Sequence, residues 1–72
     1  MSEQRPPTLG ERRVQRNFNP SANLQVELLK IKYADLIDTL EDLRTASNAR
    51  EVSIAQTEAE TSCMYAVKAI FV

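Results

Sequence analysis

The chain has 72 residues, no histidine, a single cysteine and a formal net charge of −1. A chain this short buries only about 60% of the surface that its unfolded state exposes, so it usually needs disulfides, a metal ion or partner copies. Cys63 has no second cysteine to pair with. One thiolate without histidine is a poor ligand set for zinc, and the absence of histidine removes the usual general base. We therefore expect stability to come from self-association, and a binding protein rather than an enzyme.

The first part of the chain is basic and the rest is acidic. Residues 1–32 carry a net charge of +3 and residues 33–72 a net charge of −4. Residues 1–17 also contain Pro6, Pro7 and Gly10 but few large apolar side chains, a composition that buries too little surface to order itself. The sequence predicts a flexible basic arm over residues 1–17. The charge pattern fits an anionic ligand near this arm or a solvated tail, and spacing alone leaves both open.

A first long helix is predicted to start at Asn19-Pro20-Ser21, with an apolar pattern over residues 24–43. Asn19 would cap it, with Pro20 at the first helical position, or Ser21 would cap it two residues later. Apolar residues then recur at steps of three and four, which places them on one helical face. This stripe consists of Val26, Leu29, Tyr33, Leu36, Leu40 and Leu43, with Ile37 beside it.

A second helix is predicted after the polar break at residues 45–48. Asn48 followed by Glu51 resembles a capping box. A second apolar stripe follows at helical spacing, made of Val52, Ala55, Ala59, Cys63, Ala66, Val67 and Ile70. Two long helices with a short link form an antiparallel hairpin. The predicted fold is therefore all-α, with a helical hairpin domain over residues 18–72.

Several large apolar side chains fall outside both stripes and predict contacts between copies of the chain. Leu28 and Ile31 lie far from the first stripe, and Ile54 and Tyr65 lie opposite the second. Scattered exposed apolar residues are ordinary, but here they come in pairs on a chain that is short of core. We therefore predict a homo-oligomer.

The sequence offers little for catalysis or metal binding. Asp35, Asp38 and Asp42 share a helical face, but such spacing is also that of an ordinary solvated face, and no other residue completes a site. Cys63 lies on an apolar stripe, where a thiol packs as a small hydrophobic group. We predict no catalytic residue, no metal and no cofactor.

The segment before the first long helix is more informative, since it combines guanidinium groups, an aromatic ring and small polar side chains. Helix starts offer free N–H groups to phosphate, aromatic rings stack on bases, and arginine forks fit phosphate oxygens. Lys30 and Lys32 follow in the helix, where a neighbouring subunit could supply them. Equally, Phe18 could be a hydrophobic staple and the arginines could solubilise the arm. The candidate ligand residues here are Arg12, Arg13, Arg16, Phe18, Asn19, Ser21, Lys30 and Lys32.

Residues 12–72 resemble a family of phage proteins. The motifs are Arg16-Asn17-Phe18-Asn19-Pro20-Ser21 and, in the second helix, the segments IAQTEAE (54–60) and MYAVKA (64–69). The chain is similar to the anti-CBASS cyclic-nucleotide sponges, whose helical-hairpin domain is shared with the anti-Thoeris sponges of cyclic ADP-ribose signals. It departs from family members that have tyrosine at the position of Phe18, and Ala22 stands where glycine often follows the motif.

The resemblance implies a hexamer of hairpins in the host bacterial cytoplasm that holds cyclic oligonucleotide immune signals without cleaving them. Phe18 would then stack on a base, Asn19 and Ser21 would bond a base edge or phosphate, and Lys30 or Lys32 would neutralise phosphate. Cyclic trinucleotides would bind elsewhere on the hexamer, with Arg12, Arg13, Thr57 and Lys68 as the candidates there.

Three alternatives remain open at this point. The chain could bind cyclic ADP-ribose isomers, or it could be a helical oligomerisation module with no small ligand. It could also carry a DNA- or RNA-binding arm, which the acidic helices argue against. Neither DNA, RNA nor a membrane is an expected partner, because the net charge is close to zero and no apolar run is long enough to span a bilayer.

Overall fold

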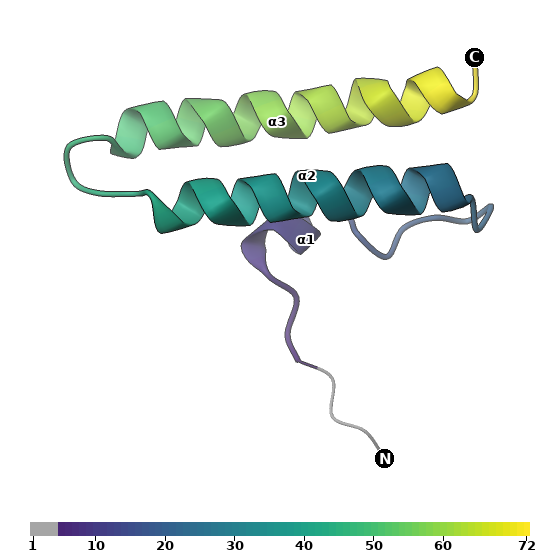
Figure 1. Cartoon of the computed structure of the whole chain (residues 1–72), viewed down its shortest axis with the longest axis horizontal. Helices are drawn as coiled ribbons and strands as arrows, with labels where there is room; N and C mark the ends of the chain where they lie inside the picture. The colour runs from purple at the N-terminus through teal and green to yellow at the C-terminus, as the bar shows by residue number, and fades with distance from the viewer. Residues whose placement is uncertain (1–4) are drawn as a thin grey trace.

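The computed structural model describes residues 5–72 as three helices, α1 (Leu9–Arg13), α2 (Leu24–Asp42) and α3 (Ala49–Ile70). The long helices α2 and α3 lie side by side, antiparallel, and are joined by a short turn (Figure 1). The short helix α1 packs mainly on α2 and also reaches α3, where Arg13 pairs with Glu60. The predicted all-α hairpin is therefore confirmed.

The helix α2 begins four residues later than the expected Asn19 cap. Asn23 caps it, because its Oδ1 accepts hydrogen bonds from the backbone N–H of Gln25 (2.8 Å) and Val26 (3.1 Å). Asn19 instead braces the turn before the helix, where its side chain bonds the backbone N–H and C=O of Asn23. Between them Ala22 has a φ of 52°, a left-handed conformation that favours glycine. Asn19 is thus part of the turn and not the helix cap.

The turn between α2 and α3 also differs from the expected capping box. Asn48 precedes α3 but makes no side-chain hydrogen bond to the first turn of that helix. Its Oδ1 accepts from the backbone N–H of Thr45 at 2.7 Å, and its Nδ2 donates to the carbonyl of Leu43 at 2.9 Å. Asn48 therefore closes the turn instead of forming a box with Glu51.

Residues 5–17 are more structured than the predicted arm. A capping box does occur here, between Thr8 and Glu11. Arg5 donates two hydrogen bonds to the Glu11 carboxylate, at 2.9 and 2.8 Å, and these bonds hold the pKa of Glu11 at about 2. Val14 is buried against the hairpin, and Leu9 packs on the same cluster. The expectation of an unpacked arm is thus wrong for residues 9–14, while residues 1–4 of that arm lie outside the described residues.

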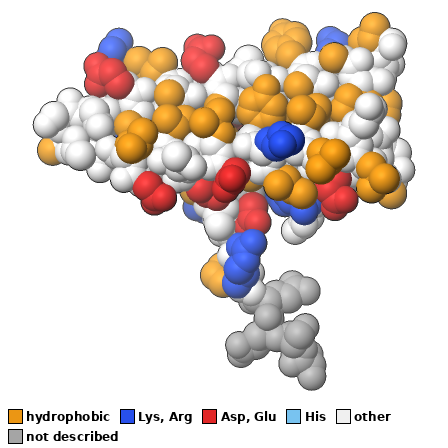
Figure 2. Space-filling view, viewed as in Figure 1, with side chains coloured by type: hydrophobic (Ala, Val, Ile, Leu, Met, Phe, Trp, Pro, Cys, Tyr) orange, Lys and Arg blue, Asp and Glu red, His pale blue; other side chains and the backbone are white. Residues whose placement is uncertain are grey.

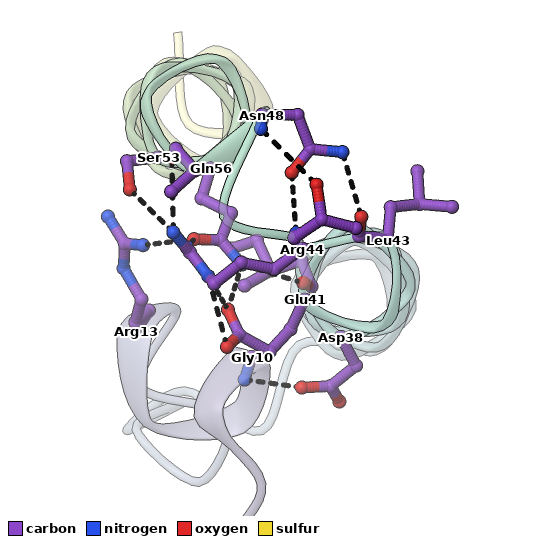
Figure 3. Close-up of polar contacts among 12 residues, drawn as sticks. Gly10, Arg13, Asp38, Glu41, Leu43, Arg44, Asn48, Ser53 and Gln56 are labelled. Atoms are coloured by element: carbon purple, nitrogen blue, oxygen red, sulfur yellow. Dashed lines mark hydrogen bonds and ion pairs between the residues drawn. The ribbon is translucent and has the colours of Figure 1, made fainter.

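Gly10 is the reason that α1 can pack so closely on α2. A Cβ atom at this position would lie 2.0 Å from the backbone oxygen of Ala34, a distance that no side chain tolerates. The backbone N–H of Gly10 donates a 2.7 Å hydrogen bond to Oδ1 of Asp38 (Figure 3). The sequence predicts a flexible arm because residues 1–17 have few large apolar side chains. Close packing of backbone against backbone, as between Gly10 and Ala34, does not require such side chains.

Gly10→Ala is therefore expected to dislodge α1. Overpacking against rigid backbone costs about 1–3 kcal/mol, more than the helix propensity of about 1 kcal/mol that alanine gains over glycine. The expected result is a lower free energy of unfolding and faster amide exchange in residues 9–14, measured by chemical denaturation and hydrogen exchange. Arg12→Ala, an exposed change in the same helix, should leave both unchanged. Equal stability and exchange in Gly10→Ala would contradict the close packing.

The core between the helices contains smaller and more polar groups than the predicted stripes. Val26 and Ile37 of the first stripe are buried, but Leu36 and Leu43 are exposed. Their place in α2 is taken by Lys30 and by small side chains. In α3 the predicted stripe is largely confirmed. The buried apolar side chains are Val14, Val26, Ala34, Ile37, Val52, Ala59 and Cys63.

A polar cluster centred on Gln56 locks the hairpin near its turn (Figure 3). The Gln56 side chain is completely buried, and its Nε2 donates to the Ile37 carbonyl (3.2 Å) and to Oε1 of Glu41 (2.9 Å). Its Oε1 accepts a 2.8 Å hydrogen bond from Nη2 of Arg44. Because buried polar groups must be paired, this cluster fixes the register of α2 against α3.

The two long helices form a layer that leaves much apolar surface uncovered. Figure 2 shows hydrophobic side chains spread over one face of the layer. Over residues 5–72, none of the helices combines the length and hydropathy of a membrane span. The exposed large apolar residues include the predicted Leu28, Ile31, Ile54, Met64, Tyr65 and Phe71.

Candidate ligand-binding site

The turn between α1 and α2 is tied to the hairpin by one ammonium group. Lys30 extends from α2 beneath this turn and is only 6% exposed. Its Nζ donates to the backbone carbonyls of Gln15 (3.0 Å) and Phe18 (2.6 Å). Gln15 has a φ of 54°, so the chain reverses sharply here. The two carbonyls and the ammonium thus form a compact cationic corner.

Phe18 covers this corner but remains largely in solvent. Its side chain is 63% exposed, and the centroid of its ring lies 5.5 Å from Nζ of Lys30, within the range of a cation–π contact. A ring so exposed adds little to the core. The exposed face of the ring is therefore available to stack on a planar group.

Two concavities lie beside Phe18 and share its ring, Lys30 and Val67 in their walls. The first, of about 320 Å³, is also lined by Arg13 and Glu60 among others. The second, of about 430 Å³, is also lined by Asn19, Pro20, Ser21 and Phe71. The Phe-Asn-Pro-Ser segment singled out in the sequence thus forms one wall of a hollow with Lys30 nearby.

Lys30 has no carboxylate counter-ion among the residues that the structure describes. No salt bridge to it occurs within residues 5–72, and burial, with a smaller contribution from the charge of Arg16, lowers its pKa. Glu60, which shares the first concavity, is already paired with Arg13 at 2.7 Å. A buried cation held by neutral carbonyls alone is costly, and an anion in either concavity would offset that cost.

The other predicted cationic residues are distributed unevenly. Arg13 lines the first concavity, and its Nη2 lies 3.4 Å from Oγ1 of Thr57, so this predicted pair is brought together. Arg16 pairs with Glu27 at 3.6 Å and lines a separate hollow beside α1.

The remaining candidates lie away from the Phe18 corner of the same protomer. Arg12 and Lys32 are exposed and line neither concavity. Lys68 lies beside Tyr65, with its Nζ 6.0 Å from the ring centroid, in a shallow hollow of α3. Within one protomer the structure therefore assembles Phe18, Asn19, Ser21, Lys30 and Arg13, and separates Arg12, Arg16, Lys32 and Lys68 from them.

Sequence reasoning missed two features of this site. Glu60 lines the first concavity, whereas the sequence indicates it only as part of the net negative charge of residues 33–72. Its position, four residues after Gln56 and three before Cys63, is the signal that could have placed it near the packed face. The carbonyls of Gln15 and Phe18 gave no signal, because their direction depends on the turn that presents them.

Comparison with known proteins places these features in a family. The model of the family described as "Acb2/Tad1, hairpin domain" matches residues 11–71, which include the Phe18 turn, Lys30 and both long helices. Searches of curated proteins and of solved structures gave no match. The matched range covers most of the chain, and it confirms the resemblance seen in the sequence motifs. The chain therefore belongs to the Acb2/Tad1 hairpin-domain family.

Proposed function

We propose that this protein binds and sequesters cyclic oligonucleotide immune signals, in particular cyclic dinucleotides such as cyclic GMP-AMP, without cleaving them. It would act as a phage counter-defence protein in the host bacterial cytoplasm and prevent activation of the CBASS effector. The observation that carries this proposal is the buried Lys30 ammonium. It has no carboxylate partner within residues 5–72 and lies beneath an exposed aromatic ring between two concavities.

The charge at Lys30 favours a ligand that contains phosphate. An ammonium group has three N–H donors, and two of them are used by the carbonyls of Gln15 and Phe18. The third is available to an anion in the neighbouring hollow. A phosphodiester oxygen would supply the missing negative charge, and a charged hydrogen bond in a partly buried place is stronger than one in water.

The aromatic ring at Phe18 favours a ligand that also contains a base. Base–aromatic stacking tolerates any base, because every base has a flat face. Asn19 and Ser21 line the second concavity beside the ring and offer polar groups to a base edge or a phosphate. Binding by stacking and charge alone needs no nucleophile and no general base, in keeping with storage of the ligand.

The size of the site favours assembly from more than one copy. Ligand pockets have volumes of about 300–1,000 Å³, and each concavity here is at the lower end of that range. A cyclic dinucleotide has two bases and two phosphates, so a pair of copies related by two-fold symmetry would match it with two Phe18 rings and two Lys30 ammonium groups. The exposed apolar face supports such assembly, and we propose that it continues to a hexamer.

Cyclic trinucleotides would bind at separate places on the assembly. Arg13 and Thr57 lie within 3.4 Å of each other, which supports a shared polar surface on α3. Arg12, Lys68 and, from another copy, Lys32 or Arg16 remain candidates for such contacts.

Calorimetric titration with cyclic dinucleotides tests the proposal, with Phe18→Ala as the diagnostic variant. Loss of a stacked base costs about 1–3 kcal/mol, and a two-fold symmetric site would lose both, so affinity is expected to fall by at least about thirtyfold. Thr39→Ala is an exposed change in α2 outside both concavities and should keep wild-type affinity. The ligand should also be recovered unchanged after digestion of the protein.

Each other outcome of this titration has a distinct meaning. Wild-type affinity in Phe18→Ala would show that the ligand binds elsewhere. Binding of cyclic ADP-ribose isomers in place of cyclic dinucleotides would identify a Thoeris signal as the ligand. Absence of binding to all of these compounds would contradict the proposed function and favour an oligomerisation module.

A further inference from the structure

We infer that Glu60 reads the base of the bound ligand and makes the site prefer guanine-containing cyclic dinucleotides. This inference rests on the proposed function. It concerns the first concavity, in which a carboxylate lies in the same hollow as the stacking ring of Phe18 and the ammonium of Lys30.

The Glu60 carboxylate is held in place through one oxygen only. Arg13 donates to Oε1 through Nε at 3.1 Å and through Nη2 at 2.7 Å. No hydrogen bond from the described residues reaches the other oxygen, Oε2, and the side chain is 37% exposed. Glu60 is therefore an oriented acceptor with one oxygen free, and it is the sole carboxylate among the residues that line this concavity.

The rest of the concavity suits a flat ring. Val14, Met64 and Val67 give it apolar walls, and the exposed face of Phe18 lies at its edge. A base stacked there keeps its faces against apolar groups and must direct its polar edge to the polar part of the wall. Arg13 and Glu60 form that part, together with Lys30, which we assign to the phosphate.

The pairing edges of the bases differ in how they meet a carboxylate. Guanine presents two adjacent donors, N1–H and N2–H. Both can donate to the free oxygen Oε2 of Glu60, whereas Oε1 already accepts two hydrogen bonds from Arg13. Adenine and cytosine present one amino donor next to a ring nitrogen with a lone pair, and that lone pair would face Oε2 and repel it. Uracil has a single N–H between two carbonyl oxygens. An oxygen that accepts from two adjacent donors thus selects guanine.

The expected preference is moderate because the site is partly open. A bidentate base contact discriminates by about ten- to a hundredfold, whereas rejection by about 10⁴-fold needs a fully enclosed polar site. We expect wild-type protein to bind cyclic di-GMP at least about tenfold more tightly than cyclic di-AMP, with a mixed dinucleotide between them.

Calorimetric titration of both ligands against Glu60→Gln is the test. Glutamine keeps an oxygen for Arg13 but replaces the other oxygen with an amino group, which repels guanine N–H donors and suits the adenine lone pair. The ratio of the two affinities should fall to about one or reverse in favour of cyclic di-AMP. Glu58→Gln changes the same charge at an exposed position of α3 and should keep the wild-type ratio.

A purely structural role of Glu60 predicts something different. If Glu60 only held Arg13 and α1 in place, Glu60→Gln would weaken both ligands by the same factor, and that result would overturn the inference. So would a wild-type ratio near one with tight binding of both ligands, which would leave the proposed function intact. Failure of wild-type protein to bind either ligand would instead contradict the proposed function.

Glu60→Asp is a second variant that distinguishes a loss of base recognition from a folding defect. It retains the carboxylate and moves it back by one methylene, so the guanine preference should weaken but keep its direction. Melting curves of all three variants would establish that they are folded at the temperature of the titration. Loss of preference in folded Glu60→Asp and its retention in folded Glu60→Gln would overturn the inference.

Discussion

Lys30→Met is expected to lower the affinity for cyclic dinucleotides by at least about a hundredfold. A hydrogen bond to a charged group contributes about 1.5–3 kcal/mol, and a two-fold symmetric ligand would lose one at each of its phosphates. Methionine keeps the length and the apolar stem of lysine, so the hairpin core stays filled. Calorimetric titration of cyclic di-GMP and cyclic di-AMP against wild type and variant measures the loss.

The same substitution also removes the group that ties down the Phe18 turn. The carbonyls of Gln15 and Phe18 would lose their shared donor, so the stacking ring would lose its support together with the phosphate contact. Both effects act in the same direction on affinity. Hydrogen exchange of residues 15–18 would report the loosened turn even without ligand.

Arg50→Met is the matched control for the lost charge. Arg50 is exposed at the start of α3 and lines neither concavity, so only its long-range attraction to an anion is lost. At physiological ionic strength that attraction is screened over about 8 Å, and affinity should change by less than about threefold. Equal losses in the two variants would mean that overall charge, and not the Lys30 corner, binds the ligand.

The sequence could name two lysines but could not choose between them. Residues 30 and 32 are two positions apart on a helix with 3.6 residues per turn, so they face nearly opposite directions. Lys30 falls at helical spacing from Val26, Tyr33 and Ile37, but the type of its side chain favours solvent, so the pattern alone gave no ground to bury its ammonium group. The structure buries Lys30 because the turn above it offers two carbonyls, and it leaves Lys32 exposed.

The presence of two long helices and their apolar periodicity were predictable because they depend on neighbours in sequence. The antiparallel pairing of α2 and α3 and the exposure of Leu28 and Ile54 follow from spacing, whereas α2 begins four residues later than predicted. Features that depend on contacts between distant parts of the chain could not be predicted from spacing. Gly10 packs against Ala34 only because α1 folds back on α2, and no local pattern indicates that contact.

The candidate site shows the same division between local and distant information. The motif Phe18-Asn19-Pro20-Ser21 was recognisable and does line a concavity near Lys30. The role of Asn19 as a brace for Asn23 was not, because two asparagines four residues apart are equally good caps by type. Glu60 enters the site through its pairing with Arg13, which is distant from it in sequence.

Ile37→Ala is expected to lower the free energy of unfolding by about 2–5 kcal/mol. Ile37 is 0% exposed. Its truncation to alanine removes apolar surface that is buried on folding, and it leaves a cavity between α1, α2 and α3. A domain of this length has a total stability of about 4–10 kcal/mol, so the loss is a large part of it. Urea or thermal denaturation followed by circular dichroism measures the change.

Leu36→Ala is the matched comparison, because it truncates a similar side chain at the neighbouring position that is 46% exposed in the hairpin. Within one copy it should cost far less than Ile37→Ala. If Leu36 is covered by another copy, its cost should grow as protein concentration rises, since association stabilises by mass action. The cost of Ile37→Ala should already be present at the lowest concentration. A Leu36→Ala loss as large as that of Ile37→Ala in the most dilute samples would contradict the burial pattern of this hairpin.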